Sequence, residues 1–149
     1  MLRGRRLAID VGTKRIGLAI TDSANIMATP LATVSDKSEV LSYLADDVEV
    51  IYIGLPLNLQ GGFTQSTKLA VNFASELQAS TEVPVRLIDE RMTTSLAASN
   101  LRESGHSEKS SRGFIDQASA IVILEAALSM EKASGEYAGK TIKEVQDES

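Results

Sequence analysis

Carboxylates interrupt three segments of this chain that are otherwise apolar. Asp10 stands inside the run Leu-Ala-Ile-Asp-Val, and Asp89 and Glu90 directly follow a second apolar run. Asp116 lies near the start of a third run, which continues to Leu128. A lone buried carboxylate is costly or has a raised pKa, and a divalent cation would compensate all three at once. Because Mg²⁺ prefers carboxylate oxygens and two such ions can cleave a phosphodiester, the pattern fits a metal site of that kind.

Each acid also has an ordinary explanation when it is taken alone. Asp10 can cap a turn at the end of a strand, and Asp89 can form a salt bridge with Arg91. Asp116 can be an acid at the start of a helix, where the helix dipole favours negative charge. No single motif here is specific, so the indication of chemistry comes from the coincidence of three acids in three apolar elements.

Basic residues accompany these acids in the sequence and could hold a phosphate backbone. They are Lys14, Arg15, Arg91, Lys109 and Arg112. Lys14 and Arg15, each taken alone, are better explained as ordinary solvated residues of a hairpin. The net charge of −5 argues weakly against a nucleic-acid partner, but it is an average over the whole chain. Nucleic acid therefore stays open as a partner.

Length and composition restrict the class of protein. A chain of 149 residues corresponds to about one domain, and 43% hydrophobic residues is ordinary for a soluble globular protein. The absence of cysteine excludes disulfides and thiolate metal sites and fits a cytoplasmic protein. The sequence contains no run of about 18 apolar residues, so we expect no membrane span.

Hydrophobic periodicity predicts an α/β fold. Three antiparallel strands are followed by alternating helices and strands, which predicts a mixed five-stranded sheet with helices on both faces. Loops are expected at 58–64, as a mobile loop, and at 104–113, and a polar, flexible tail at 133–149. The predicted strands are 5–12, 15–22, 26–34, 48–55 and 83–88, and the predicted helices are 36–46, 65–79, one from Thr93 or Thr94 to about Glu103, and 114–131.

Four stretches of the sequence, in the same order, resemble the YqgF/RuvX family. They are LAIDVGTKRIGLAITD (7–22), YIGLPLNLQGG (52–62), VRLIDERMTTSLA (85–97) and GFIDQASAIVILEAAL (113–128). These Holliday-junction-resolvase-like proteins are also described as pre-16S rRNA nucleases. The resemblance implies a ribonuclease-H-like nuclease domain over residues 1–132, with only the tail unmatched.

The resemblance also implies a catalytic metal site. Asp10, Glu90 and Asp116 match the family's three acids and would hold Mg²⁺ or Mn²⁺. Neighbouring strand residues point to opposite faces. Either Asp89 or Glu90 is therefore expected to reach the metal, and we favour Glu90.

The expected activity is processing of the 5′ end of precursor 16S rRNA in ribosome biogenesis, with a ribosomal particle as a possible partner. One alternative is resolution of Holliday junctions in branched DNA. Another is a nucleic-acid-binding ribosome-assembly module without catalysis. A monomer or weak dimer without a membrane partner is expected, although a resolvase would act as a dimer.

Overall fold

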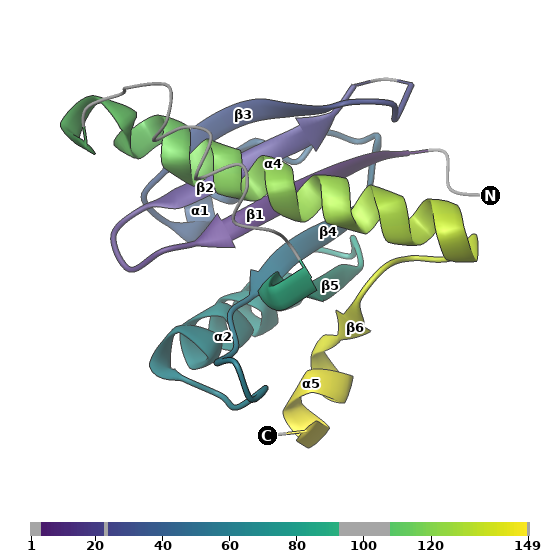
Figure 1. Cartoon of the computed structure of the whole chain (residues 1–149). Coiled ribbons are helices and arrows are strands. Elements are labelled where there is room, and N and C mark those ends of the chain that lie inside the picture. The colour runs from purple at the N-terminus through teal and green to yellow at the C-terminus, as the bar shows by residue number, and fades with distance from the viewer. Residues whose placement is uncertain (1–3, 23, 93–107, 149) are drawn as a thin grey trace.

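A computed structural model of the chain describes residues 4–22, 24–92 and 108–148, with the backbone alone for residues 108–116. Its centre is a six-stranded sheet in the order β3-β2-β1-β4-β5-β6 (Figure 1). The mixed sheet is confirmed, but it has six strands instead of the five predicted. The strands are β1 (Arg5–Val11), β2 (Ile16–Thr21), β3 (Ala28–Val34), β4 (Val48–Leu55), β5 (Val85–Asp89) and the short β6 (Lys140–Thr141).

The directions of the strands decide which side chains meet at one edge of the sheet. The first three strands form the expected antiparallel meander, whereas β4 lies parallel to β1 and β5 lies parallel to β4. In the register, Ile9 is beside Ile53, and Gly54 is beside Ile88. The carboxyl ends of β1, β4 and β5 therefore come together, with Asp10 near the end of β1.

Helices cover both faces of the sheet (Figure 1). The long α4 (Glu108–Ser134) crosses one face, where it contacts β1, β2 and β3. The helices α1 (Lys37–Ser42), α2 (Gln65–Ser80) and α5 (Ile142–Glu148) belong to the opposite face. Along β1, Leu7 and Ile9 point into the core on the side of α2, and Ala8 packs on the side of α4. Because strand side chains alternate, Asp10 lies on the α4 face with Ala8.

The helix that carries Asp116 is longer than the sequence predicts. It begins at Glu108 and ends at Ser134, so residues 108–113 are helical where a loop was expected. Those residues contain one glycine and no proline, and a single glycine in a helix costs only about 1 kcal/mol. The helix predicted from Thr93 or Thr94 to about Glu103 lies outside the described residues.

The segment from residue 133, predicted as a flexible tail, contains a strand and a helix in the structure. Strand β6 pairs with β5, and α5 packs against α2. Ala138 and Val145 are buried. The chain can fold back here because Gly139 has a φ of +72° and lies so close to the carbonyl of Leu87 that no side chain would fit. The few apolar residues among many polar ones were too sparse to reveal this packing.

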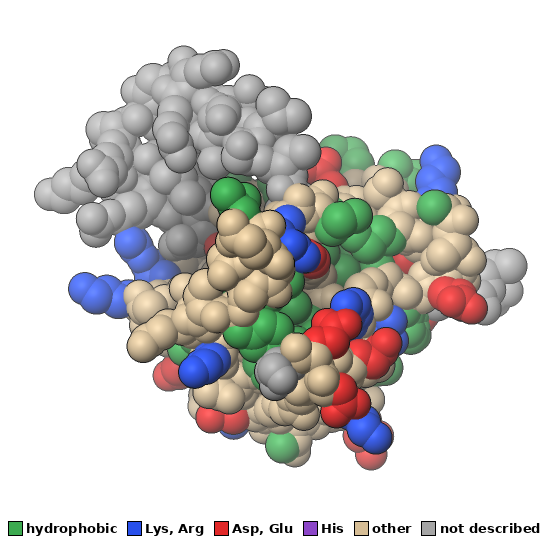
Figure 2. All heavy atoms as spheres, turned by 60° about the horizontal axis from the view of Figure 1, so that its bottom comes forward, with side chains coloured by type: hydrophobic (Ala, Val, Ile, Leu, Met, Phe, Trp, Pro, Cys, Tyr) green, Lys and Arg blue, Asp and Glu red, His purple; other side chains and the backbone are tan. Residues whose placement is uncertain are grey.

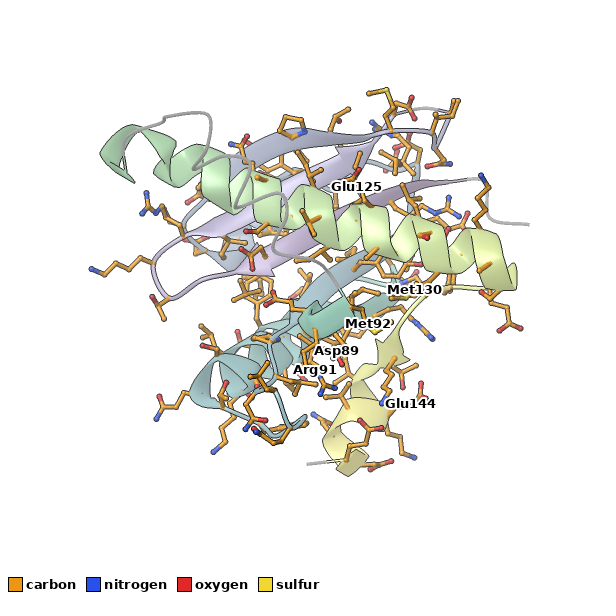
Figure 3. The ribbon with its side chains drawn as sticks, in the orientation of Figure 1. Asp89, Arg91, Met92, Glu125, Met130 and Glu144 are labelled. Carbon is orange, nitrogen blue, oxygen red and sulfur yellow. The ribbon has the colours of Figure 1, made fainter. Side chains whose placement is uncertain are left out.

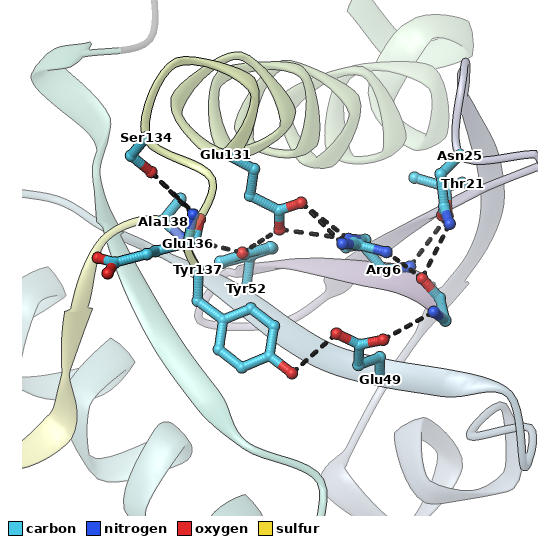
Figure 4. A network of polar contacts seen from close by, with 11 residues as sticks. Arg6, Thr21, Asn25, Glu49, Tyr52, Glu131, Ser134, Glu136, Tyr137 and Ala138 are labelled. Atoms are coloured by element: carbon cyan, nitrogen blue, oxygen red, sulfur yellow. Dashed lines mark hydrogen bonds and ion pairs between the residues drawn. The ribbon is translucent and has the colours of Figure 1, made fainter. Parts of the chain in front are cut away.

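A buried polar network joins the C-terminal end of α4 to the sheet (Figure 4). The guanidinium of Arg6 on β1 forms an ion pair of 2.9 Å with Glu131 on α4, and both side chains are buried. The Tyr52 hydroxyl donates to the Glu131 carboxylate and accepts from the N–H of Ala138 at 3.0 Å. Tyr137 donates to Glu49 at 2.9 Å. The network thus joins β1, β4, α4 and the C-terminal segment.

Candidate active site

Two of the three predicted acids meet at the carboxyl end of the parallel strands. Glu90 begins η1 (Glu90–Met92), the short 3₁₀ turn that directly follows β5. Burial raises the pKa of Glu90 to about 7, together with the negative charge of Asp10, a hydrogen bond shared with Asp10 and the charge of Asp89. The arrangement therefore brings the carboxyl groups of Asp10 and Glu90 into contact in a partly buried position.

Gly54 provides the space that the Glu90 carboxylate occupies. A Cβ atom on Gly54 would lie 2.5 Å from Oε1 of Glu90 and 2.6 Å from Cδ1 of Ile123 on α4. Gly54 belongs to the predicted strand 48–55, without a predicted role of its own, and β4 runs through it to Leu55 as predicted. The sequence could have indicated this space, because a glycine inside a buried strand of β-branched residues often marks the close approach of another group.

Asp89 points to a different partner from Glu90. Its carboxylate forms a two-pronged ion pair with Arg91, at 2.7 Å from Nη2 and 3.1 Å from Nε (Figure 3). Partial burial raises the pKa of Asp89, but the hydrogen bonds from Arg91 outweigh it and leave the pKa below its usual value. The salt bridge expected as the ordinary role of Asp89 is therefore present, and Glu90 is the member of the pair that lies beside Asp10.

The third acid is described only through its helix. Asp116 lies in α4, four residues before the fully buried Ala120, and its side chain is outside the described part of the structure. The side chains of Lys109 and Arg112 are likewise not described. Within the described residues no group of three His, Cys, Asp or Glu side chains could hold a metal ion.

Two of the predicted cations lie in the turn that follows Asp10. Lys14 is exposed and Arg15 is half-buried, and the turn is closed by a hydrogen bond from the N–H of Gly12 to the carbonyl of Arg15 at 2.9 Å. A third predicted cation, Arg91, directly follows Glu90 in the sequence, and its side chain is 39% exposed. On the face seen in Figure 2, lysine and arginine side chains are interspersed with aspartate and glutamate.

The Asp10–Glu90 pair fits a hard divalent cation. Its donors are carboxylate oxygens, which Mg²⁺ and Mn²⁺ prefer. A cation beside the two carboxylates would offset the repulsion and burial that hold the Glu90 pKa near 7. The fit rests on these two residues, and Asp116 is a candidate third ligand from its place in the sequence.

Comparison with solved structures defines the class of fold. The structure of "T. thermophilus RuvC in complex with Holliday junction substrate" matches 91% of this chain and 99% of that chain, with a TM-score of 0.60 and 14% identity. A second Thermus thermophilus RuvC structure matches with a TM-score of 0.56. The fold is therefore ribonuclease-H-like, of the RuvC type, as the resemblance implied.

Comparison of sequences identifies the family. A family described as "RuvX: Holliday junction resolvase" matches residues 4–130. A relative from Streptomyces avermitilis is 44% identical and covers 97% of this chain and 98% of its own length. A Rhodococcus erythropolis relative is 45% identical over 85% of this chain and 78% of its own length, and both are named "Putative pre-16S rRNA nuclease". The chain belongs to the RuvX family, and by this membership it is a nuclease, a hydrolase of phosphodiester bonds.

The described residues contain no helix that is long and apolar enough to cross a membrane.

Proposed function

We propose that this protein is a divalent-metal-dependent nuclease that processes the 5′ end of precursor 16S rRNA in the cytoplasm. The observation that carries the proposal is the contact between Asp10 and Glu90, which joins two carboxyl groups at the carboxyl edge of the sheet. The names of the relatives at 42–45% identity supply the substrate.

Asp10, Glu90 and Asp116 would hold Mg²⁺ or Mn²⁺. When it is bound, such an ion activates water and stabilises the leaving oxygen in phosphodiester cleavage. Asp10 is held by its strand, which pairs with β2 on one side and β4 on the other. Asp116 precedes Ala120 by four residues, about one helical turn, so both positions are on the side of α4 that faces the sheet.

Five cations would bind the phosphate backbone around these acids. Asp89 orients the Arg91 guanidinium by a two-pronged pair, which lowers the entropy lost when Arg91 binds a phosphate. The complete set is Lys14, Arg15, Arg91, Lys109 and Arg112.

The test is a cleavage assay with Mg²⁺ or Mn²⁺. A precursor 16S rRNA 5′-leader RNA and a synthetic four-way DNA junction are incubated in parallel with wild-type protein and with Asp10→Asn. We expect cleavage of the RNA that is lost in Asp10→Asn. Full activity of Asp10→Asn would overturn the proposal, and RNA binding without cleavage of either substrate would favour a non-catalytic module or a missing ribosomal partner.

Resolution of Holliday junctions is the second candidate. It is favoured by the match to a RuvC that was solved with a junction substrate and by the description of the family. A resolvase acts on a two-fold junction as a two-fold dimer. Cleavage of the DNA junction alone, by a protein that is dimeric at working concentration, would select this function.

A further inference from the structure

The turn at residues 58–62 is closed by hydrogen bonds between its own residues. It lies within one of the four stretches that resemble the family, yet it supplies none of the acids. The N–H of Asn58 donates to the carbonyl of Gly62 at 3.0 Å, and the N–H of Gly61 donates to the carbonyl of Asn58 at 2.9 Å. The side-chain Oδ1 of Asn58 accepts from the N–H of Gln60 at 3.0 Å and of Gly62 at 2.7 Å. Residues 58–62 of the loop predicted as mobile therefore form a turn held by four internal hydrogen bonds.

The turn presents an apolar side chain to solvent. Leu59 is 89% exposed, the highest value among the large hydrophobic residues of the described ranges. A single exposed leucine is common on protein surfaces. Here, however, the side chain stands on a backbone fixed by four hydrogen bonds, so the fold holds it in the solvent where it gains no burial.

Arg91 connects this turn to the acids. Its Nη1 lies 3.1 Å from the position that a Cβ atom on Gly61 would take, so the guanidinium rests against the turn. The other edge of the guanidinium is held by Asp89, the residue before Glu90. Met92, which follows Arg91, is 63% exposed. The exposed Leu59, the Arg91 guanidinium and the carboxylate pair are thus connected, either by direct contact or through residues adjacent in the sequence.

We propose that Leu59 contacts the face of an unpaired base beside the cleaved phosphate, while Arg91 contacts the phosphate backbone. In a duplex the faces of the bases are covered by stacking, so an aliphatic side chain reaches one only where a nucleotide is unpaired or a base step is opened. The substrate class is therefore RNA with unpaired nucleotides next to the cleavage position, which deepens the proposed function and rests on it.

The test measures binding, so it does not depend on cleavage. In an Asp10→Asn background, an RNA hairpin with a single-stranded 5′ leader carries 2-aminopurine at each leader position in turn. A fully paired RNA of equal length is the control substrate. We expect Leu59→Ala to weaken binding of the leader RNA about fivefold, the lower end of the loss for an aromatic base contact, because an aliphatic side chain covers less of the base. The fluorescence change at one leader position should also disappear. Binding of the paired RNA should not change.

Matched variants separate a base contact from a general effect on the protein. Leu59→Met should restore binding of the leader RNA. Ile26→Ala removes another exposed apolar side chain, which is 76% exposed and lies on the β2–β3 connection. This variant should change the binding of neither RNA. Equal weakening of both RNAs by Leu59→Ala, or none, would overturn the inference, and so would an effect confined to a four-way DNA junction. Failure of the proposed function would instead appear as wild-type protein that binds the leader RNA but does not cleave it with Mn²⁺.

Discussion

The proposed metal site depends on the two carboxyl groups of Asp10 and Glu90, which lie in contact with one another. Asp10→Asn and Glu90→Gln each remove one charge and nearly preserve the shape of the side chain. We expect each to reduce RNA cleavage at least about 100-fold, because positioned groups at an active site typically contribute that much. Each should also weaken Mn²⁺ binding, measured by calorimetry. Circular dichroism should show an unchanged fold, and a variant that keeps both full cleavage and full Mn²⁺ affinity would contradict the role.

The raised pKa of Glu90 predicts how the stability of the metal-free protein depends on pH. The folded protein keeps the Glu90 proton up to a pKa of about 7, whereas the unfolded chain releases it near 4.5. Between these values the unfolded state binds fewer protons, so the free energy of unfolding falls as pH rises. We expect a loss of up to about 3 kcal/mol from this group between pH 4.5 and 8.

Urea unfolding at pH 5 and pH 8 measures this loss. The fall should be smaller in Glu90→Gln, which cannot ionise, and Mg²⁺ at pH 8 should recover stability in the wild-type protein. If the wild type and Glu90→Gln lose the same stability between these pH values, ionisation of Glu90 does not cause the fall in the free energy of unfolding.

At the scale of the element, β4 and α4 leave room for Glu90 only because Gly54 lacks a side chain. In Gly54→Ala the new Cβ would clash with the Glu90 carboxylate and with Cδ1 of Ile123. We expect Mn²⁺ affinity to fall at least about tenfold, as happens when the support of a metal ligand is lost. Calorimetric titration with Mn²⁺ measures this.

A second variant separates the two clashes. Ile123→Val removes Cδ1, so the double variant Gly54→Ala/Ile123→Val relieves the strain against α4 but not the clash with Glu90. Its stability should recover while its Mn²⁺ affinity stays low. Recovery of both the stability and the Mn²⁺ affinity would mean that Gly54 is needed only for the packing of α4.

The ion pair between Arg6 and Glu131 fixes α4 to β1. Glu131→Ala would leave the Arg6 guanidinium buried without its charge partner, which typically costs about 3–5 kcal/mol. The double replacement Arg6→Met/Glu131→Leu removes both charges and should recover most of that stability. Urea denaturation measures both variants, and equal stability of Glu131→Ala and the wild type would contradict a structural role for the pair.

At the scale of the whole molecule, the C-terminal segment is part of the folded unit. Truncation after Ser134 removes β6, α5, the buried Val145 and the hydrogen bonds to Tyr52 and Glu49. We expect the free energy of unfolding to fall by about 3–5 kcal/mol, from one buried aliphatic side chain and a few hydrogen bonds. Thermal unfolding of the truncated chain tests this, and an unchanged melting temperature would support the flexible tail predicted from the sequence.

The sequence alone predicted most elements and their order. The apolar alternation of β1 and β2 and the periodic apolar face of α2 are local signals, set by neighbours within a few residues. The same local signals marked Asp10, Asp89, Glu90 and Asp116 as acids in apolar surroundings. The family resemblance then singled out Glu90, a choice that residue spacing left open.

Contacts between distant residues were decided only by the tertiary structure. The approach of Glu90 to Asp10 depends on the parallel register of β1, β4 and β5, and the space at Gly54 has meaning only once Glu90 and Ile123 surround it. The attachment of the C-terminal segment depends on Tyr52, which is 86 residues away from its partner Ala138. Such pairings leave no periodic trace in the chain, because each is made by the packing of elements and not by the residues next to it.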